Sequence, residues 1–184
     1  QIQQALVPEV ISADWKKWWD AAKRELKKDG HFLVPLKKSE PIAYQEKEVA
    51  LQDRLLVEFR AAKGLKARIA VAGEVVKNAE DLGDKQAVAT EIASALNAEL
   101  PSYVRTQPAV ALEAMFARDD IRELGELPPA EGELQAQSIW SQDLKLAPLM
   151  EQLPAAKHRR ALESFKAANP EHWHEVLRNH LKHV

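Results

Sequence analysis

Five histidines lie in the last 27 residues, where they could bind a metal or transfer protons: His158, His172, His174, His180 and His183. A zinc site needs several such ligands converging with tetrahedral geometry. His174 and Glu175 begin a zincin-like pattern, but its second histidine would stand at position 178, which holds an arginine. His180 lies on an apolar helical stripe, where a packed, hydrogen-bonded histidine is the more common explanation. We therefore predict no metal site.

The other side chains that enzymes use form no catalytic pattern. The carboxylate pairs Asp119–Asp120 and Glu131 with Glu133 lie in a proline-interrupted acidic stretch, which a solvated loop explains. No serine stands in a GxSxG elbow, and the six glycines form no phosphate-binding loop. The absence of cysteine excludes a thiolate nucleophile and a disulfide framework. We predict a protein that is not an enzyme and has no cofactor; a hydrolase built on the C-terminal histidines is the weakest alternative.

One segment near the start combines aromatic and basic residues at helical spacing. Trp15, Trp18 and Trp19 share one face of a helix with Ala22 and Leu26. Residues 13–38 hold eight basic and four acidic side chains, although the formal net charge of the chain is −2. Clustered cations bind phosphates or acidic protein surfaces. The candidate binding residues are Lys16, Lys17, Lys23, Arg24, Lys27, Lys28, Lys37 and Lys38.

Two interpretations of the three tryptophans remain open. Apolar stripes at helical spacing usually pack into a core, which would make these rings anchors for the helix. Exposed rings would instead stack on nucleic-acid bases. The same ring cannot do both, so burial of the tryptophans would leave only an electrostatic contact by the lysines.

The elements that would position this segment are helical. Ser12 and Gly30 are a suitable N-cap and stop signal for a helix over residues 13–29. Pro35 and Pro41 disfavour helix in the residues before them, so residues 31–41 should be extended. A chain rich in alanine and leucine and poor in tyrosine and phenylalanine is unsuited to β-architectures. The expected fold is all-α, an irregular helical array with α-solenoid-like hairpins and one extended proline-flanked segment.

Apolar residues at helical spacing continue through the rest of the chain. The expected helices cover residues 42–79, 85–99 and 108–116. Gly64 should kink or split the first of them, and Pro101 should end the second. The expected domains are a tryptophan-rich basic helix with its linker, residues 1–41, and a helical array, residues 42–184.

The C-terminal half consists of an acidic stretch followed by two helices. Residues 119–151 hold eight acidic and two basic side chains, so we expect short helices and acidic loops at the surface. Pro154 and the pair Asn169–Pro170 then begin two helices that form a hairpin.

The two ends of the sequence suggest part of a longer polypeptide. The chain begins with Gln1 rather than methionine, and its last helical pattern runs to Val184 without a stop signal. It contains no signal-peptide pattern and no apolar run of membrane-spanning length. We therefore expect a cytoplasmic protein with no membrane contact.

The segment from Ser12 to Ile42 resembles part of a known family. Asp14-Trp15-Lys16-Lys17-Trp18-Trp19 is followed by Leu26-Lys27-Lys28-Asp29 and Lys38-Ser39-Glu40-Pro41. This order is similar to the tryptophan-rich signature in the N-terminal extensions of long Gre-type transcription elongation factors of chlamydiae and other bacteria. The resemblance covers about 30 residues, and the rest of the chain is compatible with a helical extension.

The resemblance implies a parent protein that binds RNA polymerase and rescues backtracked complexes. In that family a coiled-coil finger with acidic, magnesium-holding tip residues and an FKBP-like domain do this work, and neither has an equivalent in this sequence. Asp119 and Asp120 do not stand at the tip of two long paired helices, so no catalytic residue is carried over.

Two functional hypotheses follow. The first is a non-catalytic accessory helical domain of a Gre-like factor, which contacts RNA polymerase, nucleic acid or the rest of its own chain. The second is a generic helical-repeat scaffold that binds a peptide through the acidic stretch or a groove between helices.

Overall fold

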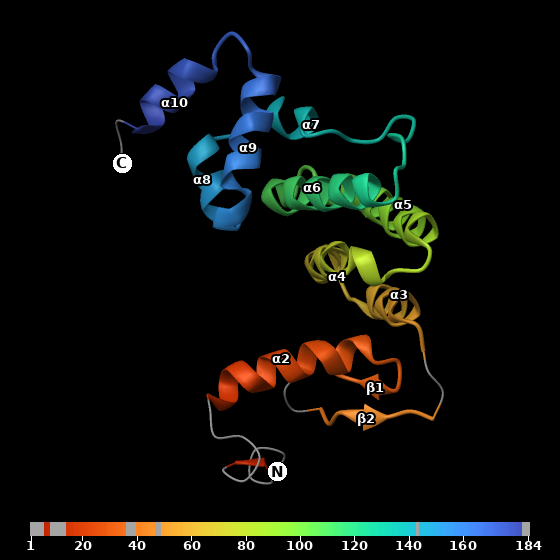
Figure 1. Ribbon diagram of the computed structural model, residues 1–184. Helices are drawn as coiled ribbons and strands as arrows, with labels where there is room; N and C mark the ends of the chain where they lie inside the picture. Colours follow the sequence, from red (N-terminus) through yellow and green to blue (C-terminus); the bar gives the residue numbers. More distant parts are fainter. Residues whose placement is uncertain (1–5, 8–13, 36–39, 47–48, 143, 182–184) are drawn as a thin grey trace. The chain divides into compact units, whose positions relative to one another are not determined.

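Helices dominate the computed structural model, which describes residues 6–7, 14–35, 40–46, 49–142 and 144–181 (Figure 1). For residues 179–181 only the backbone is described. The all-α fold class is confirmed, since the β-structure of the described residues is one two-stranded sheet. The chain divides into two compact units, Gln1–Arg54 and Leu55–Val184. The domain boundary between residues 41 and 42 stays a prediction, although the first unit continues beyond it.

The first unit is built on helix α2 (Trp15–Lys28). Its N-cap is Asp14, whose carboxylate accepts hydrogen bonds from the backbone N–H groups of Lys16 (3.0 Å) and Lys17 (3.4 Å). This cap satisfies amides that have no partner within the helix, so α2 begins two residues later than expected. The expected cap, Ser12, lies outside the described residues.

A short hairpin follows α2. Strand β1 (Phe32–Leu33) pairs antiparallel with β2 (Ala43–Tyr44), with Phe32 opposite Tyr44 and Leu33 opposite Ala43. The prediction of extended chain after α2 is confirmed at β1, but the helix expected from residue 42 is wrong at its start. The Gln45 N–H donates to the His31 carbonyl (2.7 Å), so this backbone is satisfied across the hairpin instead.

Helix α3 (Leu51–Ala61) and helix α4 (Leu65–Lys77) replace the single helix expected up to residue 79. Gly64 stands between them with φ of +82°, a conformation that glycine adopts without steric cost. The predicted split at Gly64 is confirmed. Near the start of α3, the Arg54 guanidinium donates to the carbonyls of Phe32 (2.7 Å) and Lys27, so the first turn of α3 is held to β1 and α2 within the first unit.

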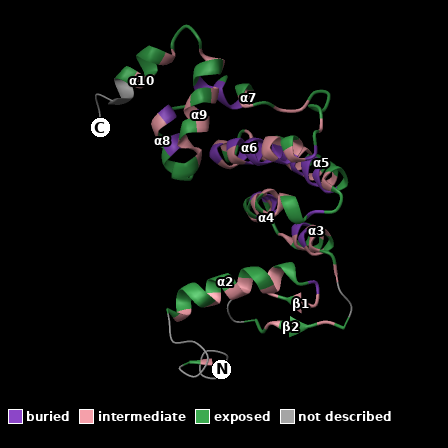
Figure 2. Ribbon diagram, viewed as in Figure 1, coloured by how far each residue is buried: buried purple, intermediate pink, exposed green. Residues whose placement is uncertain are grey.

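The second unit contains the core. A 3₁₀ turn (Ala79–Asp81) follows α4 and leads to the long helices α5 (Lys85–Tyr103) and α6 (Pro108–Leu124). Helix α6 packs against both α4 and α5, and Figure 2 shows buried residues concentrated on these three helices. Their apolar faces are almost completely shielded from solvent at Val75, Ile92, Leu96, Leu112 and Ile121.

Two helices are longer than expected. Helix α5 continues through Pro101 to Tyr103. A proline in the last turn of a helix costs only one backbone hydrogen bond, and the completely buried side chain of Leu100 offsets this cost. Helix α6 continues eight residues past Phe116, because Ala117, Arg118 and Ile121 are buried. The carboxylates of Asp119 and Asp120 therefore stand on a helix and not in a loop.

Four shorter helices complete the second unit: α7 (Gln137–Trp140), α8 (Leu146–Gln152), α9 (Ala155–Ala168) and α10 (Trp173–Leu181). The two last helices are present as predicted, but Asn169 ends α9 and does not begin α10. Both its N–H and its side-chain amide donate to the Phe165 carbonyl, each at 3.0 Å. Pro170 consequently lies in the turn before α10.

Candidate binding surfaces of the tryptophan-rich unit

The three tryptophans of α2 stack on one another along one face of the helix. The ring centroids of Trp15 and Trp19 lie 5.4 Å apart with planes inclined by 11°, and those of Trp15 and Trp18 lie 5.3 Å apart. No residue of α2 is fully buried, and Trp18 is 37% exposed. The rings are therefore neither core anchors nor free stacking platforms, since each ring already packs against its neighbours.

The basic residues of α2 occupy the rest of its circumference. Lys17, Arg24 and Lys28 recur at spacings of seven and four, so they share one face, and all three are exposed. Lys16 is also exposed, whereas Lys23 and Lys27 are half-buried on a flank. The structure thus brings six of the eight predicted binding residues together on one helix. Lys37 and Lys38 lie outside the described residues.

One lysine of α2 is held by a carboxylate of the same helix. The Lys23 ammonium lies 2.9 Å from the Asp20 carboxylate, and this hydrogen bond and its charge lower the pKa of Asp20. Because Asp20 is exposed and Lys23 is still partly open to solvent, the pair contributes little to stability. The face of Lys17, Arg24 and Lys28 is the stronger candidate for contact with an anionic partner, because all three side chains are exposed whereas Lys23 is half-buried.

A groove of about 570 Å³ runs along the side of α2 opposite its basic face. Strand β1 contacts the helix there and lies beside it in Figure 1. Its walls are apolar except for two carboxylates; the lining residues are Trp18, Trp19, Ala22, Glu25, Leu26, Asp29, Phe32 and Ile42. The sequence showed the apolar stripe but not the groove, because the second wall depends on strand pairing. In the sequence, the second wall was indicated only by the apolar residues Phe32 and Ile42, which stand on either side of the two prolines.

The Asp29 carboxylate at the end of this groove is fixed by the residue after the helix. It accepts hydrogen bonds from the backbone N–H of His31 (2.9 Å) and faces its Nδ1 at 3.1 Å. The backbone hydrogen bond, together with the His31 ring, lowers the pKa of Asp29 below its usual value despite some desolvation. This carboxylate is therefore negatively charged at neutral pH.

The C-terminal histidines do not assemble into a metal site in the part of the chain that the structure describes. His158 is occupied structurally, with Nε2 3.0 Å from the Leu153 carbonyl. His174 stacks on Trp173 with ring centroids 3.9 Å apart. The side chains of His180 and His183 lie outside the described residues.

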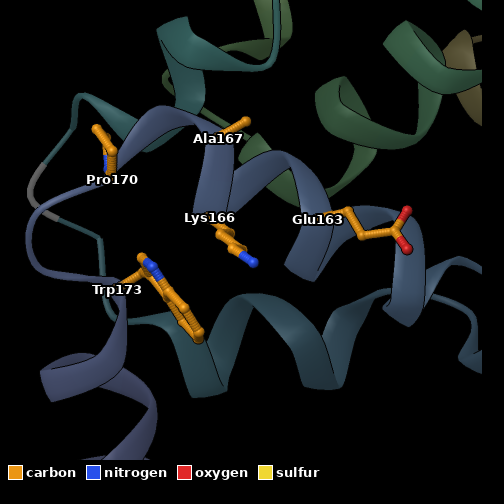
Figure 3. Close-up of a pocket in the computed structure, with 5 residues that line it drawn as sticks. All are labelled: Glu163, Lys166, Ala167, Pro170 and Trp173. Atoms are coloured by element: carbon orange, nitrogen blue, oxygen red, sulfur yellow. The ribbon is translucent and has the colours of Figure 1, made fainter.

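A small hollow beside α9 and α10 lies next to these histidines. Figure 3 shows Lys166 extending from α9 toward the indole of Trp173, with Glu163 farther along the helix. The Lys166 ammonium lies 4.7 Å from the centre of that ring, a cation–π contact. The Trp173 indole thus contacts both Lys166 of α9 and its own neighbour His174. Its contact with Lys166 joins α9 to α10.

The acidic stretch is solvated only in part: Glu123, Glu126, Glu131 and Glu151 are exposed as expected, whereas other carboxylates are paired with arginines. Arg118 is completely buried and donates to Asp119 (2.8 Å), to the Asn97 side chain (3.0 Å) and to the Leu134 carbonyl (2.7 Å). The Glu133 side chain is 2% exposed and pairs with Arg122. Burial raises the pKa of Glu133, but the Ala130 N–H and the two arginines outweigh this effect and lower it.

Asp120 of the same stretch is also paired internally, with Lys157 (3.4 Å) and Arg160 of α9. Asp119, Asp120 and Glu133 therefore hold the second unit together. Their charge is neutralised within the chain, which removes them as a peptide-binding surface.

None of the described helices combines the length and apolar character needed to span a bilayer.

Comparisons with known proteins point to transcription. Residues 1–49 match the GRAD helix-turn-helix domain family, a region that contains α2 and the hairpin. Over 117 residues the chain is 26% identical to transcription elongation factor GreA of Chlamydia trachomatis. That similarity covers 61% of this chain and extends beyond the 30-residue resemblance, but it spans only 16% of the relative's length. No solved structure matches the chain. The chain is thus similar to part of a Gre factor, and its first 49 residues are similar to the GRAD helix-turn-helix domain family.

Proposed function

We propose that this chain is a non-catalytic accessory module of a Gre-like transcription elongation factor, and that the exposed basic face of α2 binds RNA polymerase. Lys17, Arg24 and Lys28 form this face, with Lys16 beside it. The observation that carries the proposal is the segregation of these cations on one exposed helical face within the region that matches the GRAD domain.

The similarity to GreA supports polymerase as the partner, because a transcription elongation factor acts on transcribing polymerase. Exposed charges of one sign steer association with a surface of the opposite sign, and they affect the association rate more than the lifetime of the complex. The transcription-related comparisons favour the first hypothesis over the scaffold. Of the acidic stretch on which the scaffold hypothesis relies, Asp119, Asp120 and Glu133 are already engaged in internal ion pairs.

A second candidate partner is duplex DNA. The helix-turn-helix description of residues 1–49 favours it, since such domains place a helix in the major groove and contact phosphates with basic side chains. Phosphate contacts would make the affinity fall steeply with salt. The mutual stacking of the tryptophans argues against recognition of single-stranded bases by these rings.

The test compares two triple variants of the full chain that lose the same charge. Lys17→Ala, Arg24→Ala and Lys28→Ala together remove the basic face, whereas Lys63→Ala, Lys66→Ala and Arg105→Ala together remove three exposed cations of the second unit. Affinity for core RNA polymerase is measured by biolayer interferometry, with duplex DNA as the second ligand.

We expect the α2 triple variant to bind polymerase about tenfold more weakly, as three exposed charge pairs would give, and the control variant to bind like the original chain. A stronger loss for DNA than for polymerase would support the second candidate. Equal affinities of all three proteins for both ligands, or no binding at all, would overturn the proposal.

A further inference from the structure

The groove beside α2 lies on the face that the proposed polymerase contact leaves unused. Its lining on α2 runs from Trp18 to Asp29, which corresponds to about 16 Å of helix, or three turns. The volume of about 570 Å³ is in the range of binding pockets, and the walls are mostly aromatic and aliphatic. A site this long and apolar suits an elongated ligand such as the apolar face of a second helix.

The charges of the groove select among helical ligands. Its two ionisable lining residues, Glu25 and Asp29, are both acidic and exposed. The Asp29 carboxylate is held in place by the backbone N–H of His31 (2.9 Å) and lies 3.1 Å from the Nδ1 of that residue. Phosphates would be repelled by the carboxylates, so nucleic acid is not the ligand that fits.

We propose that this groove binds a basic amphipathic helix of a partner protein. Leucine-like side chains at helical spacing contact Trp18, Leu26 and Phe32, and flanking arginines or lysines lie beside Glu25 and Asp29. The argument is charge complementarity on an apolar groove, and it does not depend on the basic face of α2 or on RNA polymerase.

The first experiment measures binding of fluorescent synthetic helices to the full chain. The probe carries a leucine stripe flanked by arginines and is about 15 residues long, near the minimum for a stable isolated helix. Two counterparts carry glutamine or glutamate in place of the arginines. We expect the arginine peptide to bind about tenfold more tightly than the glutamate peptide, with the glutamine peptide between them. Equal binding of all three peptides, or no binding of any, would overturn the proposal.

A second experiment assigns the effect to the groove. Glu25→Gln should weaken binding of the arginine peptide about three- to fivefold, the effect of one exposed charge pair, and leave the glutamine peptide unchanged. Glu46→Gln removes an exposed carboxylate outside the groove and should change neither affinity. Equal weakening by both variants would place the peptide elsewhere and contradict the proposal.

The same peptides separate this inference from the proposed function. The variant with Lys17→Ala, Arg24→Ala and Lys28→Ala should bind the arginine peptide as tightly as the original chain does, whatever its affinity for polymerase. A loss of peptide binding in that variant would show that the peptide does not use the groove.

Discussion

Gly125 ends α6 where that helix comes very close to α5. A Cβ at this position would overlap the Cβ of Ala89 and lie 3.3 Å from the Leu127 Cγ. Gly125→Ala should therefore lower the free energy of unfolding by about 1–3 kcal/mol, the cost of overpacking. Gly73→Ala is the matched control, because nothing lies within 4 Å of its added Cβ inside α4; it should stabilise the protein by up to about 1 kcal/mol. Urea denaturation measures both, and equal effects would contradict the close approach.

Arg118 is the buried charge on which the second unit depends. Its guanidinium hydrogen-bonds three residues and lies 3.7 Å from the Glu133 carboxylate. Arg118→Met would therefore leave the Leu134 carbonyl without this donor and remove one cation from beside Asp119 and Glu133. We expect a loss of about 3–5 kcal/mol in the free energy of unfolding. Arg159→Met breaks an exposed pair with Glu163 and should cost less than about 1 kcal/mol. Similar losses in the two variants would mean that Arg118 is not buried in solution.

The loop between α6 and α7 is held in place by Glu133, which makes its packing sensitive to acid. Because the pKa of Glu133 is lowered in the folded chain, the carboxylate stabilises the fold above the ordinary glutamate pKa of about 4.3. This stabilisation is lost as the pH falls through the folded pKa. Glu133→Gln should therefore differ most from the original chain at pH 7 and least near pH 3. A stability difference that stays constant with pH would contradict this role.

Helices could be predicted from the sequence where local signals are strong. The tryptophan stripe and Gly30 identified α2, and Gly64 marked the break between α3 and α4. The hairpin was missed because each strand has only two residues, too few for an alternating pattern, and because their pairing joins residues 10 and 12 positions apart. The later end of α6 was missed because charge counting classified Asp119 and Asp120 as loop residues.

The candidate site was predicted only in part for a related reason. Helical spacing gives the face on which a lysine lies, so the basic face of α2 followed from the sequence. Whether a charged residue is paired depends on contacts between distant segments. Arg118 and Asn97, for example, are 21 positions apart. Composition therefore described Glu133 as solvated, whereas its side chain is buried among arginines.

The two units differ in how much apolar surface each of them buries. Among the described residues, the fully buried hydrophobic side chains all lie at or after Leu55, and α2 contains none. Local opening requires less free energy where few apolar contacts are broken. Native-state hydrogen exchange should therefore show the slowest amides in α5 and α6 and faster exchange in α2. Equal protection of α2 and α6 would contradict this difference.

Binding of RNA polymerase by the basic face of α2 is the central proposal, and reversing the charge of this face tests it most directly. The measurement is the affinity of the full chain for core RNA polymerase, before and after Lys17→Glu, Arg24→Glu and Lys28→Glu are introduced together. Reversal places like charges against the polymerase surface, so it should weaken binding beyond the loss caused by the alanine variant. Unchanged affinity after reversal, or no binding by the original chain, would contradict the account.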